Sequence, residues 1–392
     1  MVKLAPEAAV QSLANPTNDS GLREADFEDG VGLCLSGGGY RAMLFHLGTL
    51  WRLQDWGLLE KLARISSVSG GSITSGVLAM SWSRIHADAD RAKAFRERVV
   101  EPVRALAGRT IDKPSIIGGI LLPGSISDRV VAAYRKHLFG DTTLQELPDQ
   151  PRFVINATSL QSTVLWRFSK PYMGDYRVGL VPNPKVDLAT AVAASSAFPP
   201  FLSPRKIKLD PKAFQPDPDA PLQHAPYTSE VVLADGGVYD NLGLETVWKR
   251  YRTCLVSDAG MKAEEQAAPY TDWARGSMWV TELIDSQVRS LRKRQLVGSF
   301  LAPATDQNYR KGAYWSIRGD PADYPAPTSL ALPTDATAKL AAVPTRLAAL
   351  NSDLQERLVN WGYAMTDIAL RSYFDPKLPA ATAFPYSQGV GS

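Results

Sequence analysis

The stretch that decides the fold is ARISSVSGGSITSGVLAMSW, residues 63–82, in which an apolar run ends at Ser69 and two glycines follow. The apolar run predicts a buried β-strand, and the residues after the glycines predict an α-helix. The same order occurs earlier in VGLCLSGGGYRAMLFHLGTL, residues 31–50, where Ser36 precedes three glycines. Two such strand–turn–helix units so close together predict one site with two halves.

The rest of the chain extends this alternation. Further strands are expected at residues 152–160, 163–169, 230–237 and 253–260, and helices at residues 187–198 and 241–250. Strands of nearly continuous apolar residues that alternate with helices predict an α/β fold with a mostly parallel central sheet between helix layers. After residue 260 the pattern is helical, at residues 271–297 and 337–373, on either side of a Pro-rich connection.

The chain shows no internal repeat and no linker that divides it. We expect one domain over residues 30–374, with the core motifs at 30–260 and a helical C-terminal portion at 261–374. Residues 1–29 form an N-terminal lead-in, residues 375–392 form a C-terminal tail, and the Pro- and Asp-rich residues 209–226 form a surface insertion.

Composition excludes several classes of protein. The net charge of +3 on 392 residues is too small to predict nucleic-acid binding. The two cysteines, Cys34 and Cys254, lie in apolar runs and do not form a disulfide framework. No signal peptide, membrane span or metal-ligand cluster is evident in the sequence, so we expect a soluble, cytoplasmic protein without a metal.

Ser69 is the first candidate for a chemical role. A serine hydroxyl becomes a nucleophile only when a base removes its proton and donors stabilise the oxyanion. A strand–Ser–helix turn exposes such a hydroxyl, and its usual frame is G-x-S-x-G. Here the frame is Ser67-Val68-Ser69-Gly70-Gly71, so a serine replaces the first glycine. The alternative is that Ser69 only caps the following helix.

The glycine run Gly37–Gly39 precedes a helix and predicts an anion site, for a phosphate or for the oxyanion of acyl transfer. Gly37-x-Gly39-x-x-Ala42 also satisfies the dinucleotide fingerprint, but that reading needs an acidic residue at the end of the next strand. That strand ends at Ser69, and Asp55 lies late in a helix. Ser36 remains a rival nucleophile, and Arg41 either orients the loop or binds an anionic substrate.

The base is not expected to be a histidine. None of the four histidines, His46, His86, His137 and His224, lies in a stretch suited to a catalytic loop, and no histidine follows Asp235. Asp235 ends an apolar strand and precedes two glycines, so a partly desolvated carboxylate there could accept a proton. Its alternative role is a turn aspartate. Asp240 is better placed to cap a helix, and Asp258 has a context similar to that of Asp235.

Taken in order, strand–SGGGYR–helix, strand–SVSGGS–helix and strand–DGG resemble the patatin-like phospholipases over roughly residues 30–260. The resemblance implies that Ser69 is the nucleophile and Asp235 its dyad partner, and AVAASSAFPPFLSP (191–204) resembles a segment that walls the site in that family. It also implies that the matching glycines, Gly37, Gly38 and Gly39, form an oxyanion loop together with Gly70, beside Arg41. The loop departs from the family pattern at Ala42 and the elbow at Ser67.

The resemblance implies a serine hydrolase of lipid acyl esters that forms an acyl-enzyme, needs no cofactor and contacts membranes peripherally. The apolar residues 115–126 are candidates for a lid or acyl-binding wall, and residues 285–301 for an interfacial helix; buried core and a solvated helix face are the respective alternatives. Two other functions are carried as alternatives. One is a dinucleotide-dependent oxidoreductase, and the other is a non-catalytic lipid-binding module.

Overall fold

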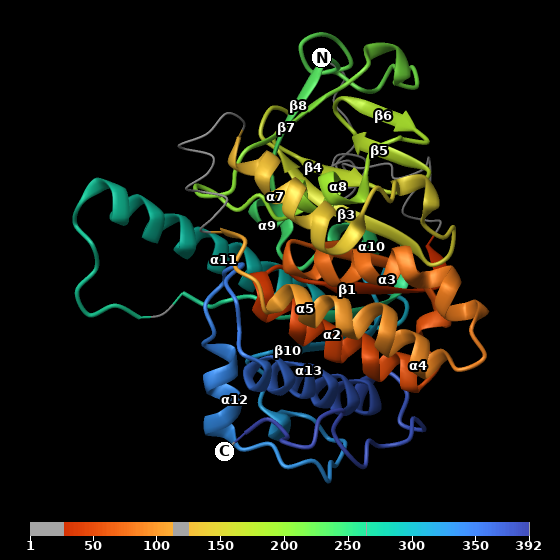
Figure 1. Ribbon diagram of the computed structural model, residues 1–392, viewed down its shortest axis with the longest axis vertical. Coiled ribbons are helices and arrows are strands. Elements are labelled where there is room, and N and C mark those ends of the chain that lie inside the picture. Colours follow the sequence, from red (N-terminus) through yellow and green to blue (C-terminus); the bar gives the residue numbers. More distant parts are fainter. Residues whose placement is uncertain (1–26, 113–124, 264, 392) are drawn as a thin grey trace.

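The computed structural model describes residues 27–112, 125–263 and 265–391 (Figure 1). Most of the predicted lead-in, residues 1–29, and of the apolar stretch 115–126 lies outside these residues. The described chain folds around one mixed β-sheet that has helices on both faces.

One half of the sheet is parallel. Its strands follow the order β10–β9–β1–β2–β3, and every neighbouring pair in this order is parallel. Their bounds are β1 (Glu28–Leu35), β2 (Leu62–Val68), β3 (Arg152–Ser159), β9 (Tyr251–Asp258) and β10 (Lys311–Ser316). Because parallel neighbours end at the same edge, the ends of β1 and β2 bring the two glycine turns together.

Antiparallel strands extend the sheet beyond β3. The strands β4, β5 and β6 continue the order, while β8 pairs with β3 and β7 pairs with β8. Their bounds are β4 (Leu165–Phe168), β5 (Tyr172–Asp175), β6 (Gly179–Pro182), β7 (Arg205–Lys208) and β8 (Glu230–Asp235). The β3–β4 hairpin is confirmed, and β8 reaches the site from the opposite direction.

Two groups of helices cover the two faces. The larger core packs residues of α2, α3, α5, α7, α8 and α13 against one face of the sheet. The smaller core joins Cys34, Cys254 and Val256 of the other face to α10 and to Leu296 of α11. The bounds are α2 (Gly39–Asp55), α3 (Gly70–Ala87), α4 (Arg91–Phe95), α5 (Glu101–Ala107), α7 (Ile126–Tyr134), α8 (Leu188–Ser195), α9 (Gly237–Asp240), α10 (Glu245–Trp248), α11 (Trp273–Leu301), α12 (Thr334–Ala341) and α13 (Ser352–Tyr373). The predicted α/β class is confirmed.

Some predicted elements differ in detail. The helix predicted at 337–373 is two helices, α12 and α13, because the segment between them contains Pro344 and leaves the helical path. Within the range of the helix predicted at 241–250 only the short helix α10 forms, and another short helix, α9, precedes that range. The strand β10 was not predicted and lies in the connection between the two predicted helical stretches. With only six residues, it gives little signal in the sequence. Among the described residues, no helix is both long and apolar enough to cross a bilayer.

The predicted C-terminal tail has no helix or strand in its described part, yet it packs on the body. Ala381 and Val390 are buried. The Asp367 carboxylate of α13 accepts the Ala381 N–H at 2.9 Å and pairs with Arg52 of α2 at 2.6 Å and with Arg371 at 2.7 Å. These contacts fix the last residues to the helix pair that supports the glycine turn.

The helices α2 and α13 cross at two glycines. A Cβ atom at Gly362 would lie 1.8 Å from the Phe45 carbonyl oxygen, and one at Gly48 would lie 2.0 Å from that of Val359. Each contact is with backbone, which cannot move aside as a flexible side chain does. The close approach of α13 therefore fixes α2, whose first turn lies at the site.

We predict that Gly362→Ala lowers the free energy of unfolding by about 3 kcal/mol, because the methyl group forces the two helix backbones apart. Gly298→Ala is the matched control. Gly298 lies in α11 with no atom within 4 Å of a Cβ at that position, so alanine there raises the free energy of unfolding by about 0.5–1 kcal/mol. Chemical denaturation measures both values, and an equal response of the two variants would refute this account of the crossing.

Candidate active site

The two predicted turns are in contact. In the β1–β2 register Leu35 lies opposite Ser67, so both strands reach the same edge of the sheet together. A Cβ atom at Gly70 would lie 2.1 Å from the Gly39 carbonyl oxygen, and one at Gly37 would lie 3.2 Å from the Ser69 Cβ. The N-termini of α2 and α3 therefore converge on Ser69, where their positive dipole ends favour negative charge.

Ser69 has an unusual backbone conformation, with φ 51° and ψ −118°. A non-glycine residue at positive φ is strained and persists only where its surroundings hold it. Its side chain makes no capping hydrogen bond to α3, contrary to the helix-cap alternative. Instead the hydroxyl forms a hydrogen bond with the Asp235 carboxylate.

Asp235 is 3% exposed at the end of β8. One carboxylate oxygen accepts the Gly237 N–H at 2.7 Å. Burial raises the pKa of this carboxyl to about 7, against the opposing effects of the hydrogen bonds from Gly237 and Ser69, and the negative charge of Asp285 raises it further. Such a carboxyl exchanges a proton near neutral pH, as a general base must.

The end of α8 holds the two turns together, a role that no local signal predicts. The Ser195 hydroxyl accepts the Ser69 N–H at 2.9 Å, and the Ser195 carbonyl accepts the Gly236 N–H at 3.2 Å. Two residues after Ser195, the Ala197 carbonyl accepts the Asp235 N–H at 2.9 Å. The segment that resembles the family's wall segment thus sets the position of Ser69 relative to Asp235.

The serine that replaces the first glycine of the elbow is accommodated by hydroxyl groups. The Ser72 hydroxyl lies 3.0 Å from that of Ser67 and 2.9 Å from that of Ser195. Ser67 is fully buried. The Ser67 hydroxyl therefore has a hydrogen-bond partner in the first turn of α3 and joins the group that holds Ser69.

The glycine loop offers fewer donors than the sequence predicted. The Gly37 N–H donates to the Asn241 carbonyl at 3.0 Å, so the prediction of Gly37 as an oxyanion donor is corrected. The N–H groups of Gly38, Gly39 and Gly70 have no acceptor within the described part of the chain. They are the remaining candidates for an oxyanion hole.

Sequence reasoning did not single out Asn241. Its amide oxygen would lie 2.3 Å from a Cβ atom at Gly37 and 2.7 Å from one at Gly237. Both positions must therefore be glycine for Asn241 to lie between the glycine loop and the Asp235 loop. Asn241 follows α9, where its only sequence signal is the polar run Asp240–Asn241.

Arg41 is fully buried. Its guanidinium donates to the Ala259 carbonyl at 2.8 and 3.1 Å and also to the Val343 carbonyl. Of the two roles predicted for Arg41, these contacts favour orientation of the glycine loop over substrate binding. Burial lowers the pKa of Arg41 to about 10, so it is charged at neutral pH.

The rival nucleophile Ser36 has other partners. Its hydroxyl accepts the Ala259 N–H at 2.7 Å and lies 3.4 Å from the His46 ring, and both residues are fully buried. Burial lowers the pKa of His46 to about 4. His46 is therefore a neutral, packed residue.

The remaining acidic candidates have structural partners. Asp240 accepts the Glu245 N–H at 2.7 Å and lies 3.6 Å from Arg292. Asp258 accepts the Gly260 N–H at 2.9 Å and the Tyr314 hydroxyl at 2.8 Å. Asp55 lies in the last turn of α2, far from the glycine loop at its first turn, and accepts the Tyr363 hydroxyl. That position leaves the dinucleotide fingerprint without its acidic residue.

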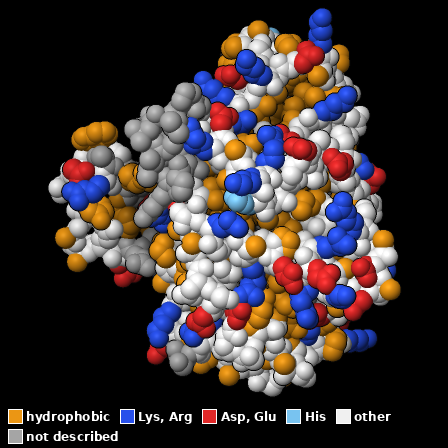
Figure 2. All heavy atoms as spheres, in the orientation of Figure 1, with side chains coloured by type: hydrophobic (Ala, Val, Ile, Leu, Met, Phe, Trp, Pro, Cys, Tyr) orange, Lys and Arg blue, Asp and Glu red, His pale blue; other side chains and the backbone are white. Residues whose placement is uncertain are grey.

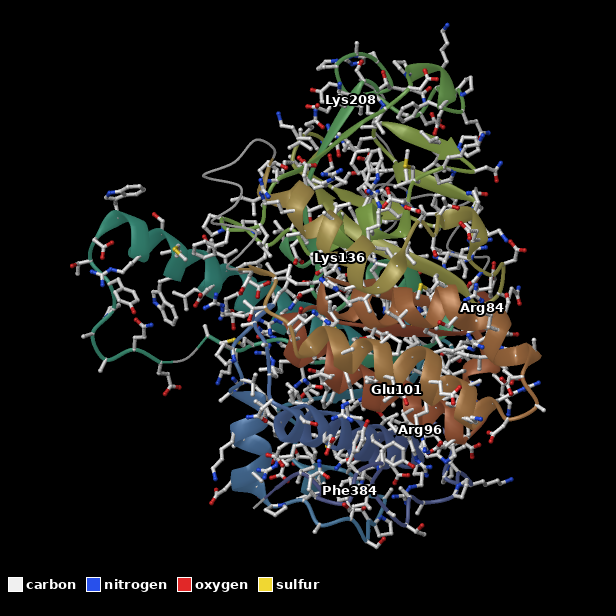
Figure 3. All side chains as sticks on the ribbon, viewed as in Figure 1. Arg84, Arg96, Glu101, Lys136, Lys208 and Phe384 are labelled. Atoms are coloured by element: carbon white, nitrogen blue, oxygen red, sulfur yellow. The ribbon has the colours of Figure 1, made fainter. Side chains whose placement is uncertain are left out.

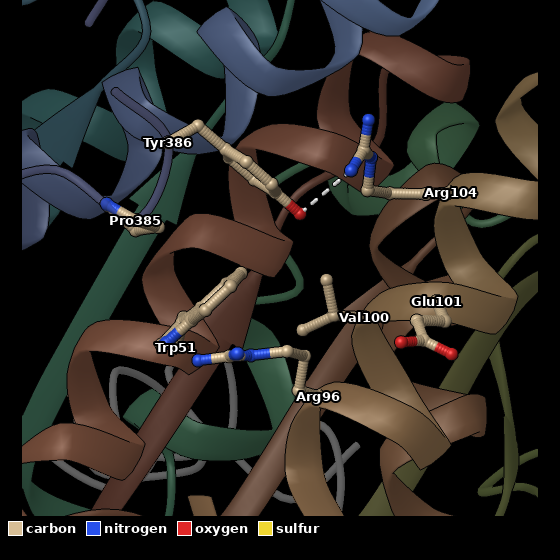
Figure 4. Close-up of a pocket in the computed structure, with 7 residues that line it drawn as sticks. All are labelled: Trp51, Arg96, Val100, Glu101, Arg104, Pro385 and Tyr386. Atoms are coloured by element: carbon tan, nitrogen blue, oxygen red, sulfur yellow. Dashed lines mark hydrogen bonds between the residues drawn. The ribbon is translucent and has the colours of Figure 1, made fainter. Parts of the chain in front are cut away.

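Two cavities lie elsewhere. One cavity of about 360 Å³ is lined by α2, α5, the turn before α5 and the C-terminal segment (Figure 4). Another of about 770 Å³ is lined by the C-terminal half of α11, β10 and Tyr373. None of the predicted site residues lines either cavity.

Comparison with known proteins identifies a family to which the chain is similar. A model of the patatin-like phospholipase family matches residues 33–248, more than half of the chain, and this range contains both glycine turns and Asp235. No curated protein sequence matches the chain.

Two solved structures are similar to this chain over most of its length. Human GIVD cytosolic phospholipase A2 is similar over 92% of this chain and 60% of its own length, at 14% identity and a TM-score of 0.52. VipD from Legionella pneumophila is similar over 86% of this chain and 66% of its own length, at 16% identity and a TM-score of 0.37. The chain thus spans less than two thirds of either relative.

We predict that Asp235→Asn stabilises the protein at pH 8. The pKa of Asp235 is raised from 3.8 to about 7 in the folded state, so the free energy of unfolding falls as pH rises through this window and stays reduced above it. At about 1.4 kcal/mol per pKa unit, the neutral amide recovers up to about 4 kcal/mol.

Thermal unfolding of both proteins at pH 8 and at a pH below 4 measures this difference. The midpoints should separate only at pH 8, because at the lower pH the aspartate is protonated in both states. Equal midpoints at pH 8 would mean that Asp235 is not buried as a carboxylate.

Proposed function

This chain belongs to the patatin-like phospholipase family, and from that premise we propose that it is a serine hydrolase of lipid acyl esters whose nucleophile is Ser69 and whose base is Asp235. The observation that carries the proposal is the hydrogen bond between the strained Ser69 and a buried carboxyl whose pKa is about 7. A nucleophile within hydrogen-bond reach of a base with such a pKa is the arrangement that covalent acyl transfer needs.

In the proposed first step, the Ser69 Oγ attacks the ester carbonyl while Asp235 accepts its proton. The negative charge that develops on the carbonyl oxygen is stabilised by the N–H groups of Gly38, Gly39 and Gly70 and by the N-termini of α2 and α3. The tetrahedral intermediate then breaks its bond to the alcohol. Asp235 returns the proton to the leaving alkoxide, which leaves an acyl group on Ser69.

In the second step, Asp235 takes a proton from a water molecule that attacks the acyl-enzyme. The same donors stabilise the second oxyanion. The bond to Ser69 breaks, the proton returns to the Ser69 Oγ, and a fatty acid leaves. No histidine is required, because the raised pKa of Asp235 lets one carboxyl serve as base and acid in both steps.

We predict that a fluorophosphonate probe modifies Ser69, at a rate that rises with pH about a midpoint near 7. The base acts only when it is ionised, so the rate falls as pH drops below the pKa of Asp235. Peptide mass spectrometry locates the adduct, and the rate is followed by gel fluorescence. Ser69→Ala should abolish modification, and Asp235→Asn should slow it by about 100-fold or more.

Ser36→Ala is the control for this experiment, since Ser36 is the other serine at the end of a strand. It should leave the rate unchanged. An adduct on Ser36, or none on Ser69, would contradict the assignment of the two turns.

We also predict that Ser195→Ala lowers kcat for ester hydrolysis by about 10- to 100-fold with little change in KM. The substitution leaves the buried Ser69 N–H without its acceptor, a loss of about 1–3 kcal/mol, and loosens the elbow without touching the substrate.

Ser196→Ala is the matched control, because the Ser196 hydroxyl binds the Val192 carbonyl and Tyr134 rather than Ser69. Steady-state kinetics separates the two variants. A rise in KM alone, or equal effects of the two substitutions, would mean that Ser195 does not position Ser69.

A further inference from the structure

The side-chain amide of Asn241 lies beside both reacting groups of the site. Its oxygen is 2.7 Å from the Cβ position of Gly237, and the Asp235 Oδ1 is 3.1 Å from the same position. The amide oxygen is also 2.3 Å from the Cβ position of Gly37, which is itself 3.2 Å from the Ser69 Cβ. An acceptor oxygen therefore adjoins the base on one side and the nucleophile on the other.

The backbone holds Asn241 in place without help from its side chain. Its carbonyl accepts the Gly37 N–H at 3.0 Å. The preceding residue, Asp240, is fully buried and accepts the Leu242 N–H at 3.2 Å and the Glu245 N–H at 2.7 Å. A change of the Asn241 side chain leaves these contacts intact, so its chemical role is testable apart from the fold.

The Asn241 amide is available to a molecule that enters the site. Within the described part of the chain, no hydrogen bond joins this amide to another residue, and the side chain is only partly buried. Other polar side chains around the two turns have partners within the protein, namely Ser36, Ser72, Ser195 and Asp258. Asn241 therefore has an acceptor oxygen that the fold itself does not use.

The charged side chains labelled in Figure 3 lie on other elements. They belong to the last turn of α3, the turn before α5, α5 itself, residues 135–139 and β7, and are Arg84, Arg96, Glu101, Lys136 and Lys208. Figure 2 shows acidic and basic side chains interspersed over the face in view, a pattern that attracts neither anions nor cations as a class. Contacts at the site itself therefore decide which molecule attacks the acyl-enzyme.

Water and an alcohol differ in the number of O–H groups that they donate. When either one attacks the acyl-enzyme, one O–H gives its proton to Asp235. The Ser69 Oγ is then part of the ester and donates no hydrogen bond, so the Asp235 carboxylate is free to accept that proton. An alcohol has no further O–H, whereas water has a second one that needs an acceptor.

We propose that the Asn241 amide oxygen accepts the second O–H of the attacking water and so directs the acyl-enzyme to water rather than to an alcohol. The proposal rests on the proposed function, since it concerns the second step of that reaction. The water oxygen bonds to the acyl carbon, one proton passes to Asp235, and the other stays on that oxygen, directed at Asn241. The bond to the Ser69 Oγ then breaks, the proton on Asp235 passes to this Oγ, and a fatty acid leaves.

The test supplies the protein with p-nitrophenyl butyrate in a buffer that contains methanol. Acylation releases nitrophenol, and the butyryl-enzyme then partitions between butyric acid and methyl butyrate, which gas chromatography measures. Asn241→Ala should raise the ratio of methyl butyrate to butyric acid by about three- to tenfold, the worth of one hydrogen bond that only water makes. A site that was merely loosened would slow both reactions and leave the ratio unchanged.

Two further variants separate the acceptor from the shape of the side chain. Asn241→Leu fills nearly the same space without an acceptor and should raise the ratio as Asn241→Ala does. Asn241→Asp keeps an oxygen at this position and should leave the ratio close to that of the unaltered protein. The ratio does not depend on how fast the ester is consumed, so a variant of low activity still gives a result.

Asn351→Ala is the matched control. The Asn351 side chain caps α13 by accepting the Leu354 N–H at 2.8 Å, so its loss lowers stability away from the site. This variant should leave the product ratio unchanged. Thermal unfolding verifies that every variant is folded.

An unchanged ratio in both Asn241→Ala and Asn241→Leu would overturn the proposal, as would an equal rise in Asn241→Asp. Failure of the proposed function gives a different result. The unaltered protein would then release no nitrophenol and carry no butyryl group on Ser69 by peptide mass spectrometry, which rejects both ideas. Nitrophenol release with a Ser69 adduct and an unchanged ratio rejects the role of Asn241 alone.

Discussion

The rest of the site depends on the hydrogen bond that the Ser195 hydroxyl accepts from the Ser69 N–H. Ser69 has a positive φ, a conformation that a serine keeps only under constraint. Ser195 also accepts the Gly236 N–H through its carbonyl. Ser195, at the end of α8, thus holds a strained turn on one side and the Asp235 loop on the other. The distance between the Ser69 and Asp235 side chains is therefore set by these contacts to backbone groups.

This constraint explains why a buried carboxylate is tolerated here. Burial that raises the pKa of Asp235 to about 7 destabilises the folded state at neutral pH. The surrounding structure offsets that penalty through contacts away from the site, such as the close crossing of α2 with α13 at Gly48 and Gly362. The same crossing fixes the first turn of α2, so stability and the position of the glycine loop have a common source.

The sequence predicted those parts of the site that depend on local order along the chain. The strands β1 and β2, the turns at Gly37–Gly39 and Ser69, and the strand before Asp235 each follow from an apolar run that ends in glycines. Ser195 and Asn241 were missed because their roles arise from contacts with residues far away in the sequence, and neither has a motif of its own.

Local patterns were also insufficient where elements are short or where a motif is altered. The six-residue strand β10 is recognisable only by its pairing with β9. Ser67 appeared to weaken the elbow, yet Ser72 and Ser195 accommodate its hydroxyl. In both cases the missing information was the partner, which only the folded chain provides.

On the proposed function, a base that must remain poorly hydrated and an acyl-ester substrate impose compatible demands on this fold. A carboxyl with a pKa near 7 loses that property if water solvates it freely, because desolvation is the main cause of its shift. Phe198, Phe201 and Val238 are exposed beside the site, so the surface next to the carboxyl is apolar. On the proposed function, the acyl chain of a bound ester covers this apolar border. The bound substrate then also preserves the desolvation on which the base depends.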